Sequence, residues 1–307
     1  MIAFVFPGQG AQKVGMGKAL ADVFPVCRDT FAEADAALGE PLSRLCFGGP
    51  EDRLMLTEHT QPAVLAVSTA AARIAMQRGL TPSFAAGHSL GEYAAHVAAG
   101  TLPFADAVRL VRERATAMQR AVPAGTGGMV VLRKMNLDEV KALVARVDAG
   151  LCELANVNEP EQIVVSGAIA AMDQVVALAP PRKALKLNVS VPFHCSLLKD
   201  AAVAFGKRLD ATAMRDPAFA VWCNVDAAPV TTAAAARSAL QRQFAGAVQW
   251  QATIEGMFAQ GVRQFVECGP KPTLVNMVKR IAVARGVDGV ETVAATTADE
   301  IAALLAK

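Results

Sequence analysis

The sequence predicts an α/β protein: a large domain with a parallel β-sheet covered by helices, and a smaller unit inserted into it. Apolar runs typical of strands alternate with helical patterns along both ends of the chain. A serine with a glycine two residues to either side lies between one such run and a helix, and in some α/β folds a serine at such a strand-to-helix turn is the nucleophile. A glycine- and proline-rich break at 123–128 opens a stretch whose elements follow a different order.

The bulk composition narrows the classes of function. At 307 residues the chain is long enough to bury a sizeable core, and 53% hydrophobic with 19% charged residues is typical of a globular α/β protein. A net charge of +2 and 5% aromatic residues argue against nucleic-acid binding. We expect a cytoplasmic protein, because the N-terminus lacks a basic leader and no apolar stretch is long enough to cross a membrane.

The cysteines and histidines predict neither disulfides nor a metal site. The six cysteines form no CxxC pair and are irregularly spaced, which is typical of buried reduced thiols. The four histidines show no HExxH arrangement and no clustering with carboxylates. We therefore expect no bound metal.

The large domain is predicted in two segments, residues 1–124 and 192–307. It opens with a strand and a tight turn, followed by polar helical segments to about residue 45. We expect strands at 2–6, 83–86, 219–223, 264–266 and near 292, and helices at 61–78, 90–99, 104–120, 196–209, 233–244, 253–260, 272–284 and the C-terminus.

Residues 125–191 are predicted to form the inserted subdomain. Its periodicity indicates a strand, a helix, two strands, a helix and a strand, at 129–132, 137–147, 151–155, 162–166, 170–178 and 184–189. This βαββαβ order is the ferredoxin-like, or split βαβ, motif.

The most informative motif is the pentapeptide Gly-His-Ser-Leu-Gly at 87–91. A GxSxG elbow presents a serine hydroxyl on a sharp turn between a strand and a helix, as in α/β-hydrolase-like domains. Its glycines allow the tight turn and leave room for a substrate. Ser89 is therefore a candidate nucleophile, and the alternative is that it only caps the following helix.

A serine nucleophile needs a base within hydrogen-bond reach. His88 adjoins Ser89 in a turn where neighbouring side chains diverge, while His96 lies along the next helix and His59 in a polar stretch. His194 lies at the subdomain junction, where a proline-fixed segment meets a helix, and substrates bind in clefts between domains. Two interpretations of His194 stay open, the base or a packed junction histidine.

The turn Phe-Pro-Gly-Gln-Gly at 6–10 ends the first strand, at the edge where parallel sheets bind ligands. An oxyanion hole needs two donors, and the residue after the nucleophile usually supplies one. We assign the two N–H groups to Leu90 and Gln9. The alternatives are a plain turn or a phosphate-binding loop, although GxGxxG is absent.

One arginine on a predicted helix faces the apolar stripe of that helix. At about 100° per residue, Arg114 projects within about 60° of Val111. Arg109, Arg112 and Arg120 project about 100° or more away. A buried guanidinium needs an anionic partner, which is either an internal carboxylate or a carboxylate on the substrate.

Five motifs, in register over essentially the whole chain, resemble the malonyl-CoA:acyl carrier protein transacylases, acyltransferases of fatty acid and polyketide synthesis. The motifs are Phe6 to Gln12, Gly87 to Glu92, Arg114 four residues before Met118-Gln119, Val191 to Cys195 with His194, and Pro270 after Glu267-Cys268-Gly269.

The resemblance implies a ping-pong acyl transfer. Ser89 attacks the thioester of malonyl-CoA with His194 as base, while Arg114 fixes the malonyl carboxylate. The backbone N–H groups of Gln9 and Leu90 hold the oxyanion. CoA leaves, the phosphopantetheine thiol of acyl carrier protein enters, and the histidine deprotonates that thiol. The resemblance implies no permanently bound cofactor, and we expect a monomer that binds neither nucleic acid nor membrane.

Supporting residues also follow from the resemblance. In this family a backbone carbonyl, in place of an aspartate, orients the histidine, and the matching position here is Gln249. The substrate pocket is expected to include His88, Met118, Phe193 and Asn158, and the bulk of Phe193 resembles that of malonyl-selective relatives.

Two other functions use the same elbow. Acyltransferases that serve a polyketide synthase or a malonate decarboxylase would share every residue named. A general α/β serine hydrolase expects an acid and then a histidine late in the chain, whereas over a hundred residues follow His194 and no matching acid stands out.

Overall fold

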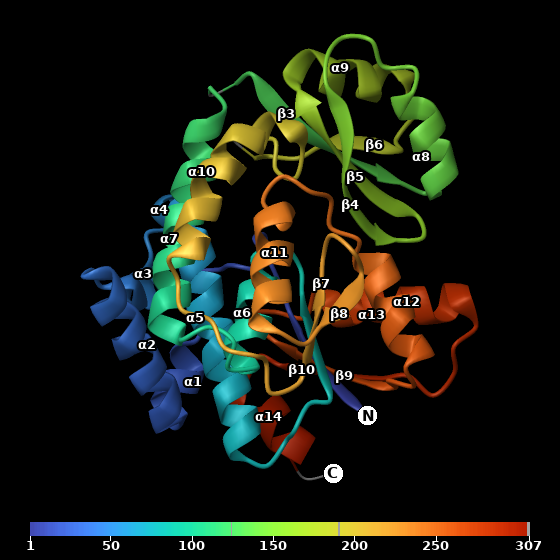
Figure 1. Cartoon of the computed structure of the whole chain (residues 1–307). Helices are drawn as coiled ribbons and strands as arrows, with labels where there is room; N and C mark the ends of the chain where they lie inside the picture. The colour runs from blue at the N-terminus through green and yellow to red at the C-terminus, as the bar shows by residue number, and fades with distance from the viewer. Residues whose placement is uncertain (124, 190, 306–307) are drawn as a thin grey trace.

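The computed structural model describes residues 1–123, 125–189 and 191–305, without the side chains of the last two. Helices surround a large sheet, and a smaller sheet with two helices of its own lies at one end of it (Figure 1). The prediction of an α/β fold with a parallel sheet is confirmed. The predicted boundary at Ala124, and Ser190 within the predicted subdomain, lie outside the described residues.

The large sheet has the strand order β10-β9-β1-β2-β7-β8. Its pairs are parallel except for the hairpin of β7 and β8. The bounds are β1 Ile2–Phe6, β2 Phe84–Gly87, β7 Ala220–Cys223, β8 Ala228–Val230, β9 Gln264–Cys268 and β10 Glu291–Ala295. The sequence analysis missed β8, because three residues with a central proline show no alternation and such a strand is tolerated only at an edge.

Helices cover both faces of this sheet, because alternate residues of its strands point to opposite sides. Phe4 and Phe6 of β1 pack into one layer, Ala3 and Val5 into the other. The first layer contains α2 (Pro25–Leu38), α5 (Thr57–Gln77), α6 (Gly91–Ala98), α7 (Phe104–Ala121), α10 (Lys199–Asp210) and α11 (Ala233–Gln243). The second contains α12 (Trp250–Ala259) and α13 (Leu274–Arg285).

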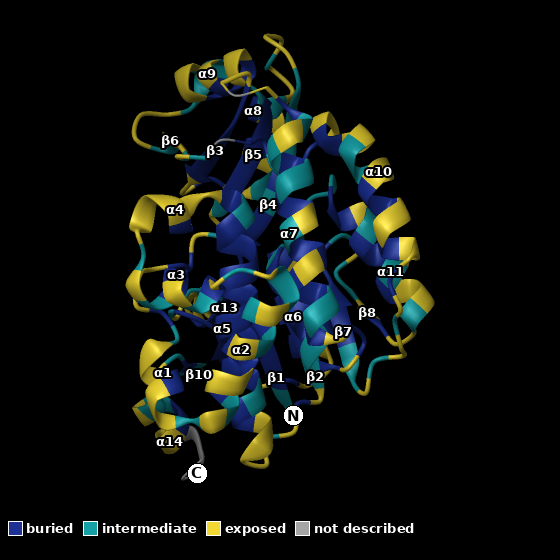
Figure 2. Cartoon of the chain, turned by 90° about the vertical axis from the view of Figure 1, so that its left-hand side faces the viewer, coloured by how far each residue is buried: buried dark blue, intermediate teal, exposed yellow. Residues whose placement is uncertain are grey.

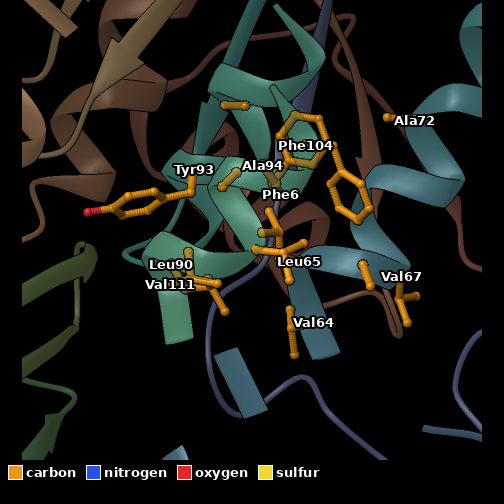
Figure 3. Close-up of a cluster of buried hydrophobic side chains, with 14 of the residues drawn as sticks. Phe6, Val64, Leu65, Val67, Ala72, Leu90, Tyr93, Ala94, Phe104 and Val111 are labelled. Carbon is orange, nitrogen blue, oxygen red and sulfur yellow. The ribbon is translucent and has the colours of Figure 1, made fainter. Parts of the chain in front are cut away.

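Burial follows these layers. Figure 2 shows the strands and the inward faces of the helices buried, with exposed residues on the outside. Figure 3 shows Phe6 of β1 within the first layer, among Leu65 of α5, Ala94 of α6 and Phe104 of α7. The polar stretch before α5 also forms α1 (Lys18–Val23) and α3 (Leu42–Gly48), which pack against α2, and α4 (Glu51–Met55), which packs against α5. Helix α14 (Ala298–Leu305) follows β10.

The small sheet is antiparallel, with the order β4-β5-β3-β6. Its elements follow the expected order: β3 (Gly127–Arg133), α8 (Leu137–Val144), β4 (Cys152–Glu159), β5 (Gln162–Ala168), α9 (Ile169–Leu178) and β6 (Ala184–Lys186). Val130 and Leu132 of β3 pack against the two helices. Met129 and Val131 point the other way, into a cluster that includes Phe193.

Among the described residues, two backbone hydrogen bonds of Val248 join the small sheet to the large domain. The N–H of Val248 donates to the carbonyl of Ala155 at 2.8 Å, and the N–H of Val157 donates to the carbonyl of Val248 at 2.9 Å. Since β4 is an edge strand of its sheet, this segment before α12 pairs with it where a further strand would. The open face of the small sheet is thereby held against the large domain.

We predict that Gly91→Ala strongly destabilises the protein, because a Cβ there would lie 2.0 Å from the carbonyl oxygen of Phe6. Overpacking against backbone should lower the free energy of unfolding by about 3 kcal/mol. Gly48→Ala is the matched control, since a Cβ there meets nothing within 4 Å. Urea unfolding of both variants tests this, and equal midpoints would contradict the close packing of α6 on β1.

Candidate active site

Ser89 lies on a sharp turn between β2 and α6. Its backbone is left-handed, with φ 53°, which is strained for a residue with a side chain. A Cβ on Gly87 would lie 1.9 Å from the backbone of Gly91, and a Cβ on Gly8 would lie 2.6 Å from the carbonyl oxygen of His88. Glycine is therefore required at these positions, and the turn after β1 lies directly against the elbow.

Asn224, just after β7, holds the elbow from the other side. Its Oδ1 accepts from the N–H of Ser89 at 2.7 Å, and its Nδ2 donates to the carbonyl of Gly87 at 2.7 Å. These bonds satisfy backbone groups that the turn would otherwise leave buried and unpaired. Nothing in the spacing of the sequence indicated this residue.

The structure brings Ser89 and His194 together, with Oγ 2.7 Å from Nε2. The other ring nitrogen, Nδ1, lies 3.0 Å from the carbonyl oxygen of Gly246 and 3.3 Å from that of Gln243. A carbonyl only accepts, so Nδ1 carries the proton and Nε2 is free to take one from the serine. Burial, reinforced by the positive charge of Arg114, lowers the pKa of His194 to about 3, so the ring is neutral.

The expectation for Gln249 is wrong. Gln249 precedes α12, and its N–H donates to the carbonyl of Asn224 at 2.9 Å. The carbonyls that reach His194 belong to the last residue of α11 and to Gly246 beyond it. The final carbonyls of a helix have no partner within the helix, and its negative dipole end favours an imidazolium. The C-terminus of α11 is therefore suited to orient a histidine.

Arg114 of α7 is 1% exposed and reaches the nucleophile. Its Nη1 donates to Oε1 of Gln61 at 2.8 Å, and its Nη2 donates to Oε1 of Gln243 at 2.9 Å and to Oγ of Ser89 at 3.1 Å. These acceptors are uncharged, and no carboxylate of the described residues forms a salt bridge with this guanidinium. The site thus has a buried cation beside a hydroxyl.

A cavity of about 120 Å³ lies over Ser89, with His194, Arg114 and Phe193 in its lining. A larger cavity of about 470 Å³ extends from the start of α13 along the small sheet. The two share part of their lining, namely Gln9, His88, Asn156 and Leu187. Together they connect the nucleophile with the space between the two sheets.

Gln9 and Leu90 line the small cavity, as the oxyanion assignment requires. Within the described part of the chain, neither backbone N–H donates to a protein acceptor, whereas the N–H of Gly91 donates to the carbonyl of His88. Two N–H groups without a protein partner beside a serine hydroxyl match the donors of an oxyanion hole.

Three of the four expected pocket residues line one or both cavities. His88 lines both cavities and Phe193 the smaller, while Asn158 lines the larger and its Oδ1 lies 2.8 Å from Nε2 of His88. Met118, also expected in the pocket, is in the lining of neither cavity. Its side chain is buried in the core, and its sulfur lies 3.9 Å from Nε2 of Gln61, which lines the smaller cavity.

Several contributors were missed by the sequence analysis. They are Gln61, Glu92, Asn224, Gln243 and Gly246. A carboxylate directly after the elbow, on a mostly buried helix, was the one available signal. Within the described residues no three metal-binding side chains gather, and no helix there is both long and apolar enough for a membrane span.

An elbow serine on a parallel sheet, a neutral histidine at its hydroxyl and two free N–H groups define a serine acyl-transfer or hydrolytic site. The model of the acyl transferase domain family matches residues 3–300. The chain therefore belongs to this family.

Similar proteins support that membership. The malonyl CoA-acyl carrier protein transacylase of Salmonella typhimurium is 43% identical over 99% of this chain and 97% of its own length. That of Bacillus subtilis is 41% identical over 91% and 90%. An acyl-carrier-protein S-malonyltransferase structure from Burkholderia pseudomallei has a TM-score of 0.95 at 41% identity and covers 100% of this chain and 99% of that one. A malonyl-transacylase solved with a type II PKS acyl-carrier protein has a TM-score of 0.93 at 40% identity, covering 99% of each.

The lowered pKa of His194 predicts that its ring stays neutral from pH 8 down to about pH 5. Long-range ¹H–¹⁵N spectra of histidine-labelled protein should show no change of its ring-nitrogen shifts over that range. His194→Gln assigns the resonance by its disappearance. A titration centred near pH 6.5 would contradict the burial of this imidazole.

Proposed function

We propose that this chain transfers the malonyl group from malonyl-CoA to the phosphopantetheine thiol of acyl carrier protein, through a malonyl-serine intermediate, and supplies fatty acid synthesis. Relatives 41–43% identical over at least 90% of their length are malonyl CoA-acyl carrier protein transacylases. The observation that carries the proposal is the buried fork of Arg114, which reaches Ser89 and, among the described residues, hydrogen-bonds only to uncharged partners. Such a fork favours an acyl group that ends in a carboxylate.

In the first half-reaction Oγ of Ser89 attacks the thioester carbonyl and gives its proton to Nε2 of His194. The N–H groups of Gln9 and Leu90 bind the oxyanion of the tetrahedral intermediate. Collapse of this intermediate forms the serine ester and expels the CoA thiolate, which takes the proton from the imidazolium. The carbonyls at the end of α11 hold the imidazole in the productive tautomer throughout.

In the second half-reaction the incoming thiol gives its proton to the same Nε2, and the thiolate attacks the serine ester. The leaving Oγ then recovers the proton from His194. The larger cavity is the route we assign to the pantetheine arm, since it adjoins the small cavity and opens beside the start of α13. No bound metal or resident cofactor is required for these steps.

A second function has a specific observation in its favour. One solved relative is in complex with a type II PKS acyl-carrier protein, so a polyketide pathway is the alternative destination of the malonyl group. The chemistry at Ser89 would be the same. Turnover with purified carrier proteins of each pathway separates the two.

Several finer assignments belong to the same proposal. We assign residues 1–124 and 192–307 to an α/β-hydrolase-like domain and residues 125–191 to a ferredoxin-like subdomain, on the basis of their element order. A monomer in the cytoplasm stays a prediction of the sequence.

Incubation with malonyl-CoA should add one malonyl group to the wild type and none to Ser89→Ala, because no other hydroxyl lies against His194 in the described cavity. Intact-mass spectrometry measures this. His194→Ala should slow both half-reactions by roughly 10²–10⁴-fold through loss of the base. An adduct that persists in Ser89→Ala would overturn the nucleophile assignment.

Replacing Arg114 with alanine should reverse part of the acyl selectivity. In the wild type, acetyl transfer is penalised because a neutral acetyl group leaves the buried guanidinium without a carboxylate partner. Arg114→Ala removes this penalty. We expect malonyl transfer to be lost and acetyl transfer to gain relative to it. Phe193, in the lining of the small cavity, should crowd a methyl group on the malonyl α-carbon. The values of kcat/KM for malonyl-, methylmalonyl- and acetyl-CoA test both, and an unchanged preference order in Arg114→Ala would count against the fork.

A further inference from the structure

The buried charge of Arg114 has a counter-charge that does not touch it. Glu92 of α6 is fully buried, and the side chain of Gln243 stands between the two. Gln243 accepts from Nη2 of Arg114 at 2.9 Å through Oε1, and it donates to Oε2 of Glu92 at 3.0 Å through Nε2. The order is therefore guanidinium, carboxamide, carboxylate.

The orientation of this carboxamide is fixed by its neighbours. Nε2 of Gln243 also donates to the backbone carbonyl of Ser89 at 2.7 Å, and a carbonyl can only accept. Its oxygen must then face Arg114. Glu92 is fixed in turn, because the N–H of Asn224 donates to the same Oε2 at 2.9 Å.

The carboxylate and the guanidinium influence each other across the amide. Burial raises the pKa of Glu92 to about 7, against the effect of the hydrogen bonds from Gln243 and Asn224 and the charge of Arg114. Asp226, after β7, and Arg242 of α11 also act on this carboxyl, with opposite signs. At pH 8 Glu92 is mostly ionised, so it can balance a buried cation.

A direct ion pair would have a different consequence for the site. A carboxylate in contact with Arg114 would occupy the donors of the fork and would neutralise its charge where the acyl group binds. A substrate carboxylate would then have to displace it. The uncharged oxygen of an amide holds the guanidinium in place with a weaker bond.

We propose that Gln243 is a spacer that keeps Glu92, the counter-ion of Arg114, one amide away from the fork, and that this separation sets the preference for acyl groups with a carboxylate. Both are positioning residues, since they act through Arg114. The inference rests on the proposed function, in which Arg114 binds the malonyl carboxylate.

Removing the negative charge of Glu92 and moving it to position 243 should change the preference for malonyl over acetyl in opposite directions. Glu92→Gln keeps an oxygen for the two N–H donors but leaves Arg114 without a counter-charge, so the fork should attract a substrate carboxylate more strongly. The exchange Glu92→Gln/Gln243→Glu keeps the same two groups in the same volume and puts the carboxylate against Arg114. This double variant is the matched partner of the single one.

The experiment measures kcat and KM at pH 8 for malonyl-CoA and acetyl-CoA with the wild type, both variants and Arg114→Ala. In Glu92→Gln the ratio of kcat/KM, malonyl over acetyl, should rise by about 3–10-fold. In the exchange variant it should fall at least about tenfold, mainly through a higher KM for malonyl-CoA. Thermal melting of each variant accompanies the kinetics.

Two results would show that the pair is only structural and would overturn the inference. One is a malonyl-over-acetyl ratio in the exchange variant equal to that of the wild type. The other is an equal fall of kcat/KM for malonyl-CoA and acetyl-CoA in Glu92→Gln. If the exchange variant does not fold, the ratio in Glu92→Gln decides alone: a rise supports the spacer, and an unchanged or lower ratio refutes it. An unchanged ratio in Arg114→Ala would instead refute the proposed role of Arg114. The two failures are therefore distinguishable.

Discussion

The left-handed backbone of Ser89 is the constraint on which the rest of the site depends. A serine in this conformation is held only if its surroundings over-determine it. Here β1 and β2 are adjacent parallel strands, and three glycines let the elbow and the turn after β1 come into contact. Asn224 hydrogen-bonds to the elbow on both sides of its turn. The hydroxyl therefore projects at the carboxyl edge of the sheet, where the small sheet closes over it.

A second constraint is the buried positive charge beside that hydroxyl. Arg114 is held by two amide oxygens and the serine, so its position is fixed while its charge is only partly balanced. The same charge, together with burial, keeps His194 neutral. One arginine thus favours both an anionic acyl group and the free base that accepts the proton of Ser89.

Local patterns in the sequence indicated most of the elements and, together with the family resemblance, the nucleophile, the base and the arginine. The elbow, the inward angle of Arg114 and the junction position of His194 are properties of short segments, and the structure brings all three together. The element order of the inserted unit was also readable, because each element has its own periodicity.

What could not be read depends on contacts between segments far apart in the chain. Gln243 bonds Ser89 across 154 positions and Asn224 does so across 135, and neither carries a local motif. The same reason explains the error at Gln249: a carbonyl that orients a histidine is fixed by where a helix ends in space. Met118 was expected in the pocket from the family resemblance, whereas its sulfur lies against Gln61 of α5, a contact between distant segments that has no local signal.

The central claim is that Ser89 carries a malonyl group that is passed to a thiol in preference to water. The most direct test isolates the malonyl-enzyme after removal of malonyl-CoA and then adds acyl carrier protein bearing phosphopantetheine, in a single turnover followed by mass spectrometry. We predict that malonyl leaves the enzyme and appears on the carrier in equal amounts. Release of free malonate, with the carrier unmodified, would contradict the account.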